Sequence, residues 1–288
     1  MTRQPVIARH AEDLLGSAVA ATAPVAGGDS STATKLRLSS GSTALMKTLP
    51  HAPADFFHAE ARGLRWLAEA TPAGGVPVPE VLAVDDECLI LAWVEPGKAS
   101  SDAAAGFGRA LAATHAAGAP TYGAVSDGYI GRLPLPQRPT DTWAEFYAVR
   151  RVLPYLKLAR DRDALSAADA SSVESVIGRL TTLLPTEPPA RLHGDLWNGN
   201  VLWAGDGRVW AVDPAASGGH RELDLAMLAL FGMPHLPRVL EAYQEVSPLA
   251  DGWEERVALH QLFPLLVHAA MFGGRYGPRA ADLAARYA

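Results

Sequence analysis

Residues 193–200 of the chain read His-Gly-Asp-Leu-Trp-Asn-Gly-Asn, and an Asp-Pro pair follows at 213–214. The stretch supplies a carboxylate at Asp195, a carboxamide at Asn200 and a second carboxylate at Asp213. A carboxylate can take the proton of an attacking hydroxyl, and the oxygens of a carboxamide and a carboxylate suit a magnesium ion. This order and spacing are typical of a loop that transfers a phosphoryl group from ATP. We therefore expect Asp195 to be the catalytic base, and Asn200 and Asp213 to bind Mg²⁺.

A predicted hairpin explains how the two magnesium ligands would meet. Gly205-Asp206-Gly207 separates two apolar runs, 200–204 and 208–213, and the Asp206-Gly207 dipeptide is typical of a two-residue type I′ turn. With that turn, Asn200 lies opposite Asp213, and side chains opposite each other in an antiparallel pair are about 5 Å apart. An ordinary surface hairpin with polar ends is the alternative, and the catalytic loop at the right offset argues against it.

The length and composition predict a globular protein of about two domains or lobes. The chain has 288 residues, of which 49% are hydrophobic and 19% charged, a balance unlike that of a disordered chain. No apolar run approaches the roughly 20 residues of a membrane helix, so we expect no membrane partner. Cys88 is the only cysteine, which excludes an internal disulfide and fits a reducing cytoplasm. The formal charge of −6 argues against a nucleic-acid partner and leaves small cationic or neutral substrates open.

The predicted elements divide the chain into two unequal lobes, an α+β, bilobal, protein-kinase-like layout. Residues 1–92 form a small β-rich lobe for the nucleotide, and residues 93–97 form a hinge. Residues 98–288 form a larger, mostly helical lobe with the catalytic loop and the acceptor site. The small lobe is expected to hold helices over 4–16 and 55–70 and hairpins that join 34–38 to 43–47 and 80–84 to 88–93. Apolar periodicity predicts helices in the large lobe over 101–117, 143–160, 167–184, 222–232, 235–246 and 252–272.

A lysine and a glutamate in the small lobe have the arrangement of a phosphate clamp. Lys47 ends a predicted strand, and Glu60 lies on the apolar stripe of the next helix, which Asp55 is expected to cap. A buried carboxylate without a partner is costly, so we expect Lys47 to pair with Glu60 and to aim its ammonium at the ATP α- and β-phosphates. A purely structural salt bridge, or a Glu60 that points to solvent, is the alternative.

Two further segments are candidates for binding the rest of the nucleotide. The backbone of Ala92, Trp93 and Val94, just before the hinge, is expected to face adenine, although an apolar strand end would have the same sequence. Residues 27–31, Gly-Gly-Asp-Ser-Ser, occupy the place of a phosphate-covering loop. They lack the Gly-x-Gly-x-x-Gly spacing, so by themselves they indicate only a turn whose backbone amides could line phosphates.

The sequence around the catalytic loop favours a small acceptor molecule. Gly194 stands where protein kinases carry an arginine, and Asp213-Pro214 is soon followed by an apolar helix that starts at Glu222. No segment remains to hold a peptide substrate. Asp224, near the start of that helix, is expected to face the positive end of the helix dipole and to brace the catalytic loop. His193 is expected to be a buried, hydrogen-bonded support of the loop.

The chain resembles the fructosamine kinase (ketosamine 3-kinase) family, a group of small-molecule kinases related to aminoglycoside phosphotransferases. The resemblance runs from end to end, and its most distinctive tract is 192–232. The motifs that carry it include Trp143-Ala144-Glu145-Phe146-Tyr147, Leu192-His193-Gly194-Asp195-Leu196-Trp197, Asp213-Pro214-Ala215, Gly219-His220-Arg221-Glu222, Asp224-Leu225-Ala226-Met227 and Phe272-Gly273-Gly274. The resemblance implies the site roles given above, with ATP and Mg²⁺. It also implies phosphorylation of the sugar C3 hydroxyl of ketoamines, the adducts of sugars with small or protein amines, as a deglycation repair.

Several positions leave the acceptor open. Members of the family commonly have serine where Asn198 stands and aromatic residues near Ala216-Ser217, so the sugar can be a ribulosamine or a fructosamine. Trp197 and Trp143 either stack on the sugar or pack in the core. A kinase for another hydroxylated amine, such as an aminoglycoside or a choline-like compound, is the alternative within the class. A catalytically silent pseudokinase that serves as a binding module is the alternative outside it.

Overall fold

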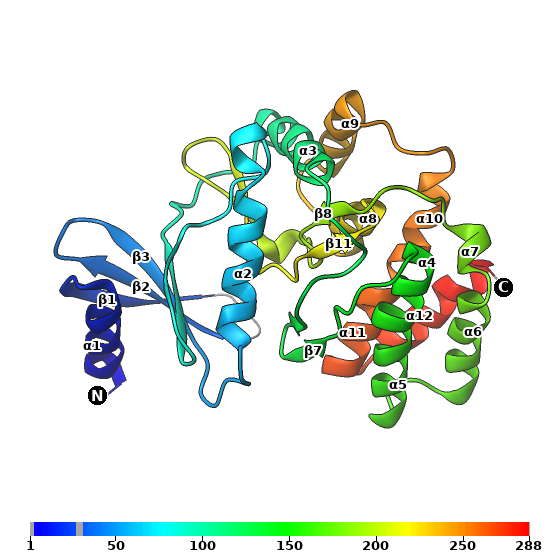
Figure 1. The fold of residues 1–288 in the computed structure, drawn as a ribbon, viewed down its shortest axis with the longest axis horizontal. Helices are drawn as coiled ribbons and strands as arrows, with labels where there is room; N and C mark the ends of the chain where they lie inside the picture. Colours follow the sequence, from blue (N-terminus) through cyan, green and yellow to red (C-terminus); the bar gives the residue numbers. More distant parts are fainter. Residues whose placement is uncertain (1–2, 27–30, 288) are drawn as a thin grey trace.

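The computed structural model describes residues 3–26 and 31–287, in which a sheet-containing N-terminal part is followed by a helical C-terminal part (Figure 1). Of the candidate phosphate-covering loop at 27–31, only Ser31 lies within the described residues. None of the described helices is long and apolar enough to cross a membrane.

The N-terminal part is a five-stranded antiparallel sheet of order β1-β2-β3-β5-β4. Its strands are β1 (Val19–Val25), β2 (Thr32–Leu38), β3 (Thr43–Thr48), β4 (Val81–Val84) and β5 (Cys88–Ala92), and its helices are α1 (Arg3–Leu15) and α2 (Phe56–Ala68), with a 3₁₀ turn at Thr71–Ala73. Both hairpins and both helices expected here are confirmed. The sequence did not predict β1, because this edge strand is rich in alanine and contains Pro24, which weakens a strand pattern.

The alternation of side chains along β3 and β5 decides which helix each residue meets. Met46 and Ile90 pack in the cluster that α1 covers, whereas Leu45 and Leu91 pack in the cluster that α2 covers. Successive side chains of a strand point to opposite faces, so Lys47 shares the face of Leu45 and points toward α2. The strand period therefore directs this lysine to the helix that carries the candidate glutamate.

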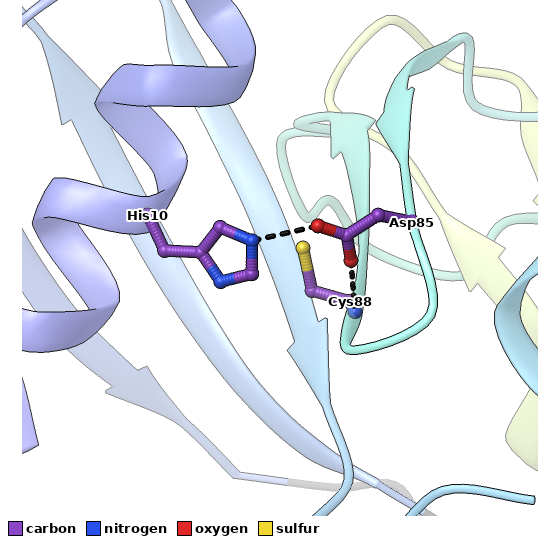
Figure 2. A group of neighbouring side chains, drawn as sticks. All are labelled: His10, Asp85 and Cys88. Carbon is purple, nitrogen blue, oxygen red and sulfur yellow. Dashed lines mark hydrogen bonds and ion pairs between the residues drawn. The ribbon is translucent and has the colours of Figure 1, made fainter.

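A polar contact ties α1 to the turn between β4 and β5 (Figure 2). The His10 ring, from Nε2, lies 2.7 Å from Oδ2 of Asp85, and the backbone N–H of Cys88 donates to Oδ1 of the same carboxylate at 2.8 Å. Burial raises the pKa of the Cys88 thiol to about 12, so this cysteine stays a neutral, packed side chain. The three residues thus act as a structural link.

Asp55 occupies the N-cap position of α2, as expected, but its side chain does not cap the helix. Asp55 precedes the helix, but it adopts a left-handed conformation (φ 65°), and its carboxylate makes no capping hydrogen bond. It instead pairs with both terminal nitrogens of Arg62, at 2.8 and 2.6 Å. An aspartate before a helix pattern does not reveal whether its side chain turns to the backbone or to a cation about two turns further on.

The C-terminal part is helical, with three short antiparallel strand pairs. Its helices are α3 (Ser101–Ala116), α4 (Trp143–Phe146), α5 (Leu153–Asp161), α6 (Ala167–Ile177), α7 (Leu180–Leu183), α8 (Glu222–Leu230), α9 (Leu236–Val246), α10 (Trp253–His260), α11 (Leu262–Phe272) and α12 (Tyr276–Ala284), with a π-helix at Tyr147–Val152 and 3₁₀ turns at Asn198–Asn200 and Ala285–Tyr287. The strand pairs are β6 (Gly128–Ile130) with β7 (Leu133–Leu135), β8 (Ala190–Leu192) with β11 (Ser217–Gly219), and β9 (Val201–Trp203) with β10 (Val209–Ala211).

The expected helices are all present, but three of them are interrupted where the sequence predicted one continuous helix. Pro154 has no N–H for the carbonyl of Arg150, and a π-helix precedes α5 at this point. Pro264 likewise cannot donate to the carbonyl of His260, where α10 ends. The third break, at residues 178–179, separates α6 from α7. The pairs β6–β7 and β8–β11 were not predicted, because three-residue strands carry no readable period. Helix α12 was not predicted either.

The segment between the two parts is anchored to the β9–β10 hairpin. Pro96 bridges Ala204, the N–H of Gly97 donates to the carbonyl of Trp203 at 2.7 Å, and Gly205 donates to the carbonyl of Glu95 at 2.8 Å. The β9–β10 hairpin is therefore hydrogen-bonded to the segment that the sequence analysis assigns to a hinge. The division of the chain at 93–97 stays a prediction.

Candidate active site

The β9–β10 hairpin exists, but its register differs by one residue from the expected one. Trp203 pairs with Val209. Asn200 lies opposite Val212, which donates its backbone N–H to the Asn200 carbonyl at 3.0 Å. The expected pairing of Asn200 with Asp213 across the strands is therefore wrong.

The turn explains this shift. The loop has three residues, 205–207, and Gly207 takes a left-handed φ of 79°, while Asp206 is not among the residues with a positive φ. A type I′ turn requires a positive φ at both central positions, whereas a type I turn followed by a left-handed glycine makes a three-residue loop. The carboxylate of Asp206 accepts the backbone N–H of Arg208 at 2.9 Å, which favours the observed turn.

The three residues of the opening motif nevertheless converge. The Asn200 carboxamide donates through Nδ2 to the carbonyl of Asp195 at 2.8 Å, to Oδ2 of its carboxylate at 3.1 Å, and to the carbonyl of Asp213 at 3.5 Å. Asp213 has a left-handed φ of 55°, which turns the chain where the hairpin ends. The convergence thus comes from a 3₁₀ turn before β9 and a left-handed residue after β10, and not from the strand register.

Lys47 binds two carboxylates at the centre of the site. Its Nζ donates to both oxygens of Glu60, at 2.7 and 2.8 Å, and to Oδ1 of Asp213 at 2.8 Å. Only 4% of Lys47 is exposed. Burial alone would lower the pKa of Lys47, but the charges of Asp213 and Glu60 outweigh it and raise the pKa above its usual value. The predicted pair is present, and the lysine carries a positive charge held next to the second aspartate.

A fully buried carboxylate holds the start of the candidate catalytic loop, residues 193–200. Asp224, on α8, accepts the backbone N–H of His193 at 2.8 Å and that of Gly194 at 2.9 Å. His193 is buried, its Nδ1 accepts the N–H of Asp195 at 3.3 Å, and its Nε2 donates to the carbonyl of Val212 at 2.9 Å. Burial lowers the pKa of His193, so the ring is neutral and fits these roles. The expected supports of the loop, His193 and Asp224, are confirmed.

Gly194 allows this loop to approach the segment after Asp213, and replacing it should be costly. The residue has a left-handed φ of 81°, and a Cβ here would overlap the carbonyl of Ala215. We expect Gly194→Ala to lower the free energy of unfolding by about 2–3 kcal/mol, from backbone strain and the forced shift of Ala215. Denaturant unfolding measures this loss. Gly41→Ala, at another left-handed glycine (φ 89°) with nothing near its Cβ, should cost only about 1 kcal/mol, so equal losses would contradict the steric explanation.

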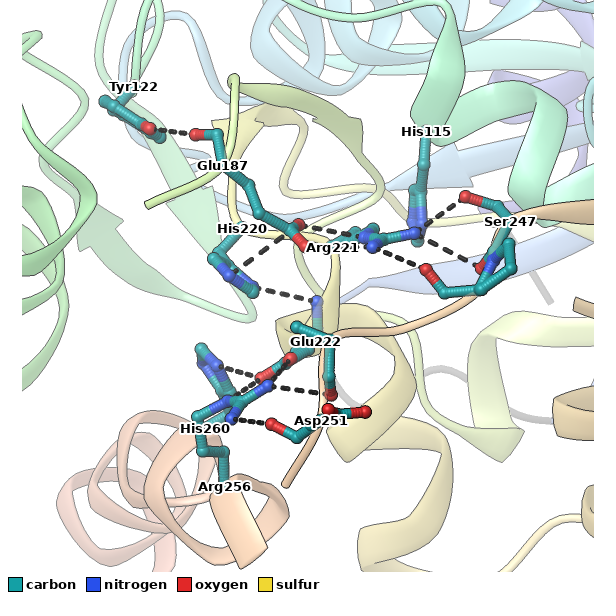
Figure 3. A network of polar contacts seen from close by, with 12 residues as sticks. His115, Tyr122, Glu187, His220, Arg221, Glu222, Ser247, Asp251, Arg256 and His260 are labelled. Atoms are coloured by element: carbon teal, nitrogen blue, oxygen red, sulfur yellow. Dashed lines mark hydrogen bonds and ion pairs between the residues drawn. The ribbon is translucent and has the colours of Figure 1, made fainter. Parts of the chain in front are cut away.

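Helix α8, which carries Asp224, is itself held by a buried polar network (Figure 3). Glu222 accepts from Nε and Nη2 of Arg256 at 2.9 and 2.6 Å, and Arg221 makes a two-point pair with Glu187 at 2.8 Å. Burial opposes ionisation of Glu222, but His260 and Arg256 outweigh it and lower its pKa to about 2. Because both Glu222 oxygens are committed to Arg256, we read this network as a structural anchor of the helix start.

The candidate residues line one large cleft of about 1100 Å³. Lys47, Glu60, Asp195, Asn200 and Asp213 lie in its wall, and so do Ala92, Trp93 and Val94. The cleft also has apolar walls beyond these residues, including Val25, Ala33, Leu45, Leu91 and Leu202. All the described site residues that the sequence proposed therefore open into a single space.

Among the three residues proposed to face adenine, the hydrogen bonding of the backbone N–H distinguishes Val94 from the other two. The N–H of Ala92 donates to the carbonyl of Glu80 at 2.8 Å, and that of Trp93 donates to Thr43 at 3.2 Å. Within the described ranges 3–26 and 31–287, the N–H of Val94 has no hydrogen bond to the protein. Val94 is therefore the residue whose amide can bind a base.

The two candidate stacking tryptophans have different surroundings. Trp143 is buried and packs against Phe146 and Tyr147, so it belongs to the core. Trp197 lines the cleft and meets Phe231 edge to face at 5.6 Å. Sequence reasoning missed several polar or aromatic cleft residues, namely Asp127, Tyr129, Gln137 and His268. Asp127 and Gln137 lie in loops, Tyr129 lies in the three-residue strand β6, and His268 lies in the apolar helix α11, so no short motif marks them.

Solved structures establish the class of the fold. A crystal structure of a candidate fructosamine-3-kinase from Thermobifida fusca superposes with a TM-score of 0.91 at 49% identity, covering 98% of each chain. A choline kinase from Streptococcus pneumoniae superposes with a TM-score of 0.65 at 15% identity, covering 99% of this chain and 98% of that chain, and at this identity the likeness shows the fold alone.

 The fold is that of the protein-kinase-like phosphotransferases, and the expected bilobal α+β class is confirmed.

The sequence comparisons narrow the class to a family. The chain matches the fructosamine kinase family over residues 3–287. A probable ketoamine kinase of Thermus thermophilus is 40% identical over 233 residues, which cover 81% of this chain and 82% of that protein. The chain belongs to the fructosamine kinase family, and it is therefore a kinase that uses ATP.

Proposed function

We propose that the chain is a magnesium-dependent ketosamine 3-kinase, which transfers the γ-phosphoryl group of ATP to the C3 hydroxyl of a ketoamine. The observation that carries the proposal is the convergence of Asp195, Asn200, Asp213 and Lys47 on one cleft. In the reaction, the C3 oxygen forms a bond to the γ-phosphorus as the bond to the β–γ bridging oxygen breaks. ADP leaves, and the hydroxyl proton passes to Asp195.

The donor atoms of the site fit a magnesium ion. Lys47 engages Oδ1 of Asp213, so Oδ2 can serve as a ligand, and Asn200 donates through Nδ2, which leaves its Oδ1 as an acceptor. Magnesium prefers such oxygen ligands, with water and phosphate completing its shell. When bound, the ion neutralises charge on the ATP phosphates. Asn200 and Asp213 would hold it.

The remaining residues bind and orient the nucleotide in this proposal. Lys47, fixed by Glu60, presents its ammonium to the α- and β-phosphates, and the amide of Val94 donates to the adenine ring. Ala92 and Trp93, which line the cleft beside Val94, contact the adenine ring. The N-terminal sheet thus positions the nucleotide, while the C-terminal part supplies the acceptor site and the catalytic base, Asp195.

The acceptor is a ribulosamine or fructosamine on a small molecule or on a protein, and phosphorylation at C3 destabilises the adduct and so repairs the glycated amine. The test is an acceptor screen with ribulosyl-lysine, fructosyl-lysine, an aminoglycoside and choline, each with Mg-ATP. We expect turnover with the ketoamines and, in the purified product, phosphorus–carbon coupling at C3 by NMR. Turnover confined to the aminoglycoside or choline would refute the ketoamine assignment, and phosphate on another carbon would refute the position.

A further inference from the structure

One carboxylate of the cleft has no role in the reaction described above. Asp127 precedes β6, is exposed and lines the cleft. Its Oδ1 accepts the backbone N–H of Gln137 at 2.7 Å. Within residues 3–26 and 31–287, no lysine, arginine or histidine forms an ion pair with it. Its second oxygen is thus available to a ligand in the cleft.

The wall that carries Asp127 is rigidly joined to the segment after Asp213. The side chain of Gln137 donates through Nε2 to the carbonyl of Ala216 at 3.2 Å. Its Oε1 accepts from Nη2 of Arg151 at 2.6 Å, and the same nitrogen contacts Oγ of Ser217 at 3.3 Å. Only 2% of Arg151 is exposed. These contacts hold Asp127 on the acceptor side of the cleft.

The other acidic groups of the cleft are already engaged. Glu60 and Asp213 share the ammonium of Lys47, and Asp195 belongs to the catalytic loop. The second cation of the wall, Arg62, is paired with a carboxylate outside the cleft lining. An additional positive charge on a bound acceptor would therefore find its partner at Asp127.

We propose that Asp127 binds the ammonium group of the acceptor and so selects amine-bearing sugars over plain ketoses. The inference rests on the proposed function. The amine nitrogen of a ketoamine is a secondary alkylamine, protonated at neutral pH, and it lies a few bonds from the C3 hydroxyl. A carboxylate in the wall of the cleft that also holds Asp195 can accept its N–H while the hydroxyl faces Asp195. Asp127 acts on binding and takes no part in proton transfer.

The test compares charged and neutral acceptors in the Asp127→Asn variant. Asparagine keeps the oxygen that accepts from Gln137 but removes the charge. We expect the KM for fructosyl-lysine or ribulosyl-lysine to rise about 5- to 10-fold, as befits a partly exposed ion pair. The kcat, the KM for ATP and the KM for fructose or ribulose should change less than about twofold. Asp141→Asn, at an exposed aspartate outside the cleft lining, is the matched control and should change none of them.

The possible outcomes separate the inference from the proposed function. An equal rise in KM for ketoamines and plain ketoses would show that Asp127 only shapes the loop, and an unchanged ketoamine KM would also overturn the inference. Neither result affects the ketoamine assignment. A wild-type protein that phosphorylates no ketoamine would overturn both. Thermal unfolding of the variant, expected to match the wild type within a few degrees, confirms that the comparison is made on folded protein.

Discussion

Replacing Asp195 by asparagine is expected to lower kcat for a ketoamine by about 10²–10⁴, because a carboxamide cannot accept the hydroxyl proton. The exchange preserves the shape of the side chain and leaves an oxygen that can accept from Nδ2 of Asn200. The KM for ATP and the stability should therefore change little. Steady-state kinetics with saturating Mg-ATP measure the first effect, and nucleotide titration measures the second.

The control for this experiment is a carboxylate of the N-terminal part. Asp86 is 88% exposed in its side chain and does not line the cleft, so Asp86→Asn should keep full turnover. Equal turnover of the Asp195 variant and the wild type would remove Asp195 from the reaction. A variant that lost nucleotide binding together with turnover would instead indicate a role in building the site.

The sequence predicted the parts of this site that depend on local patterns. Lys47 and Glu60 could be paired because Glu60 lies on the apolar stripe of α2, where a buried carboxylate needs a cation. The hairpin was also predictable, but its register was not, since Asp-Gly fits both a two-residue turn and a three-residue loop with a left-handed glycine. The pairing of the two strands differs by one residue between these two turns.

Asp127, Gln137 and Arg151 could not be identified from the sequence, for a different reason. Asp127 and Gln137 come from a region of three-residue strands and loops, and Arg151 lies in a π-helix. No periodic pattern relates these residues to each other. Gln137 and Arg151 are joined by hydrogen bonds to Ala216 and Ser217, in the segment after Asp213, and Asp127 is joined to Gln137. The sequence could place Asp195, Asn200 and Asp213 because they share one motif, whereas Asp127 and Gln137 reach the cleft through tertiary contacts.

Asp224→Asn is expected to lower the free energy of unfolding by about 3 kcal/mol and to reduce kcat at least about tenfold. The carboxylate is fully buried and accepts the N–H groups of His193 and Gly194, with His115 at 3.3 Å. An asparagine has one oxygen for these donors and turns its NH₂ group toward another N–H. The catalytic loop then loses one anchor, and Asp195 loses its fixed position.

The pH dependence of this loss identifies its cause. Burial alone would raise the pKa of Asp224, but His115 and the backbone amide of Gly194 outweigh it and lower the pKa. A group with a lowered pKa stabilises the fold above its unfolded pKa, and this contribution disappears as the pH falls through the folded value. The difference in the free energy of unfolding between wild type and variant, measured with denaturant, should therefore be constant near neutral pH and become smaller in acid. Asp282→Asn, at an exposed position of α12, should stay within about 0.5 kcal/mol of wild type throughout. A gap that persists undiminished in acid would show that the charge of Asp224 is not what holds the loop.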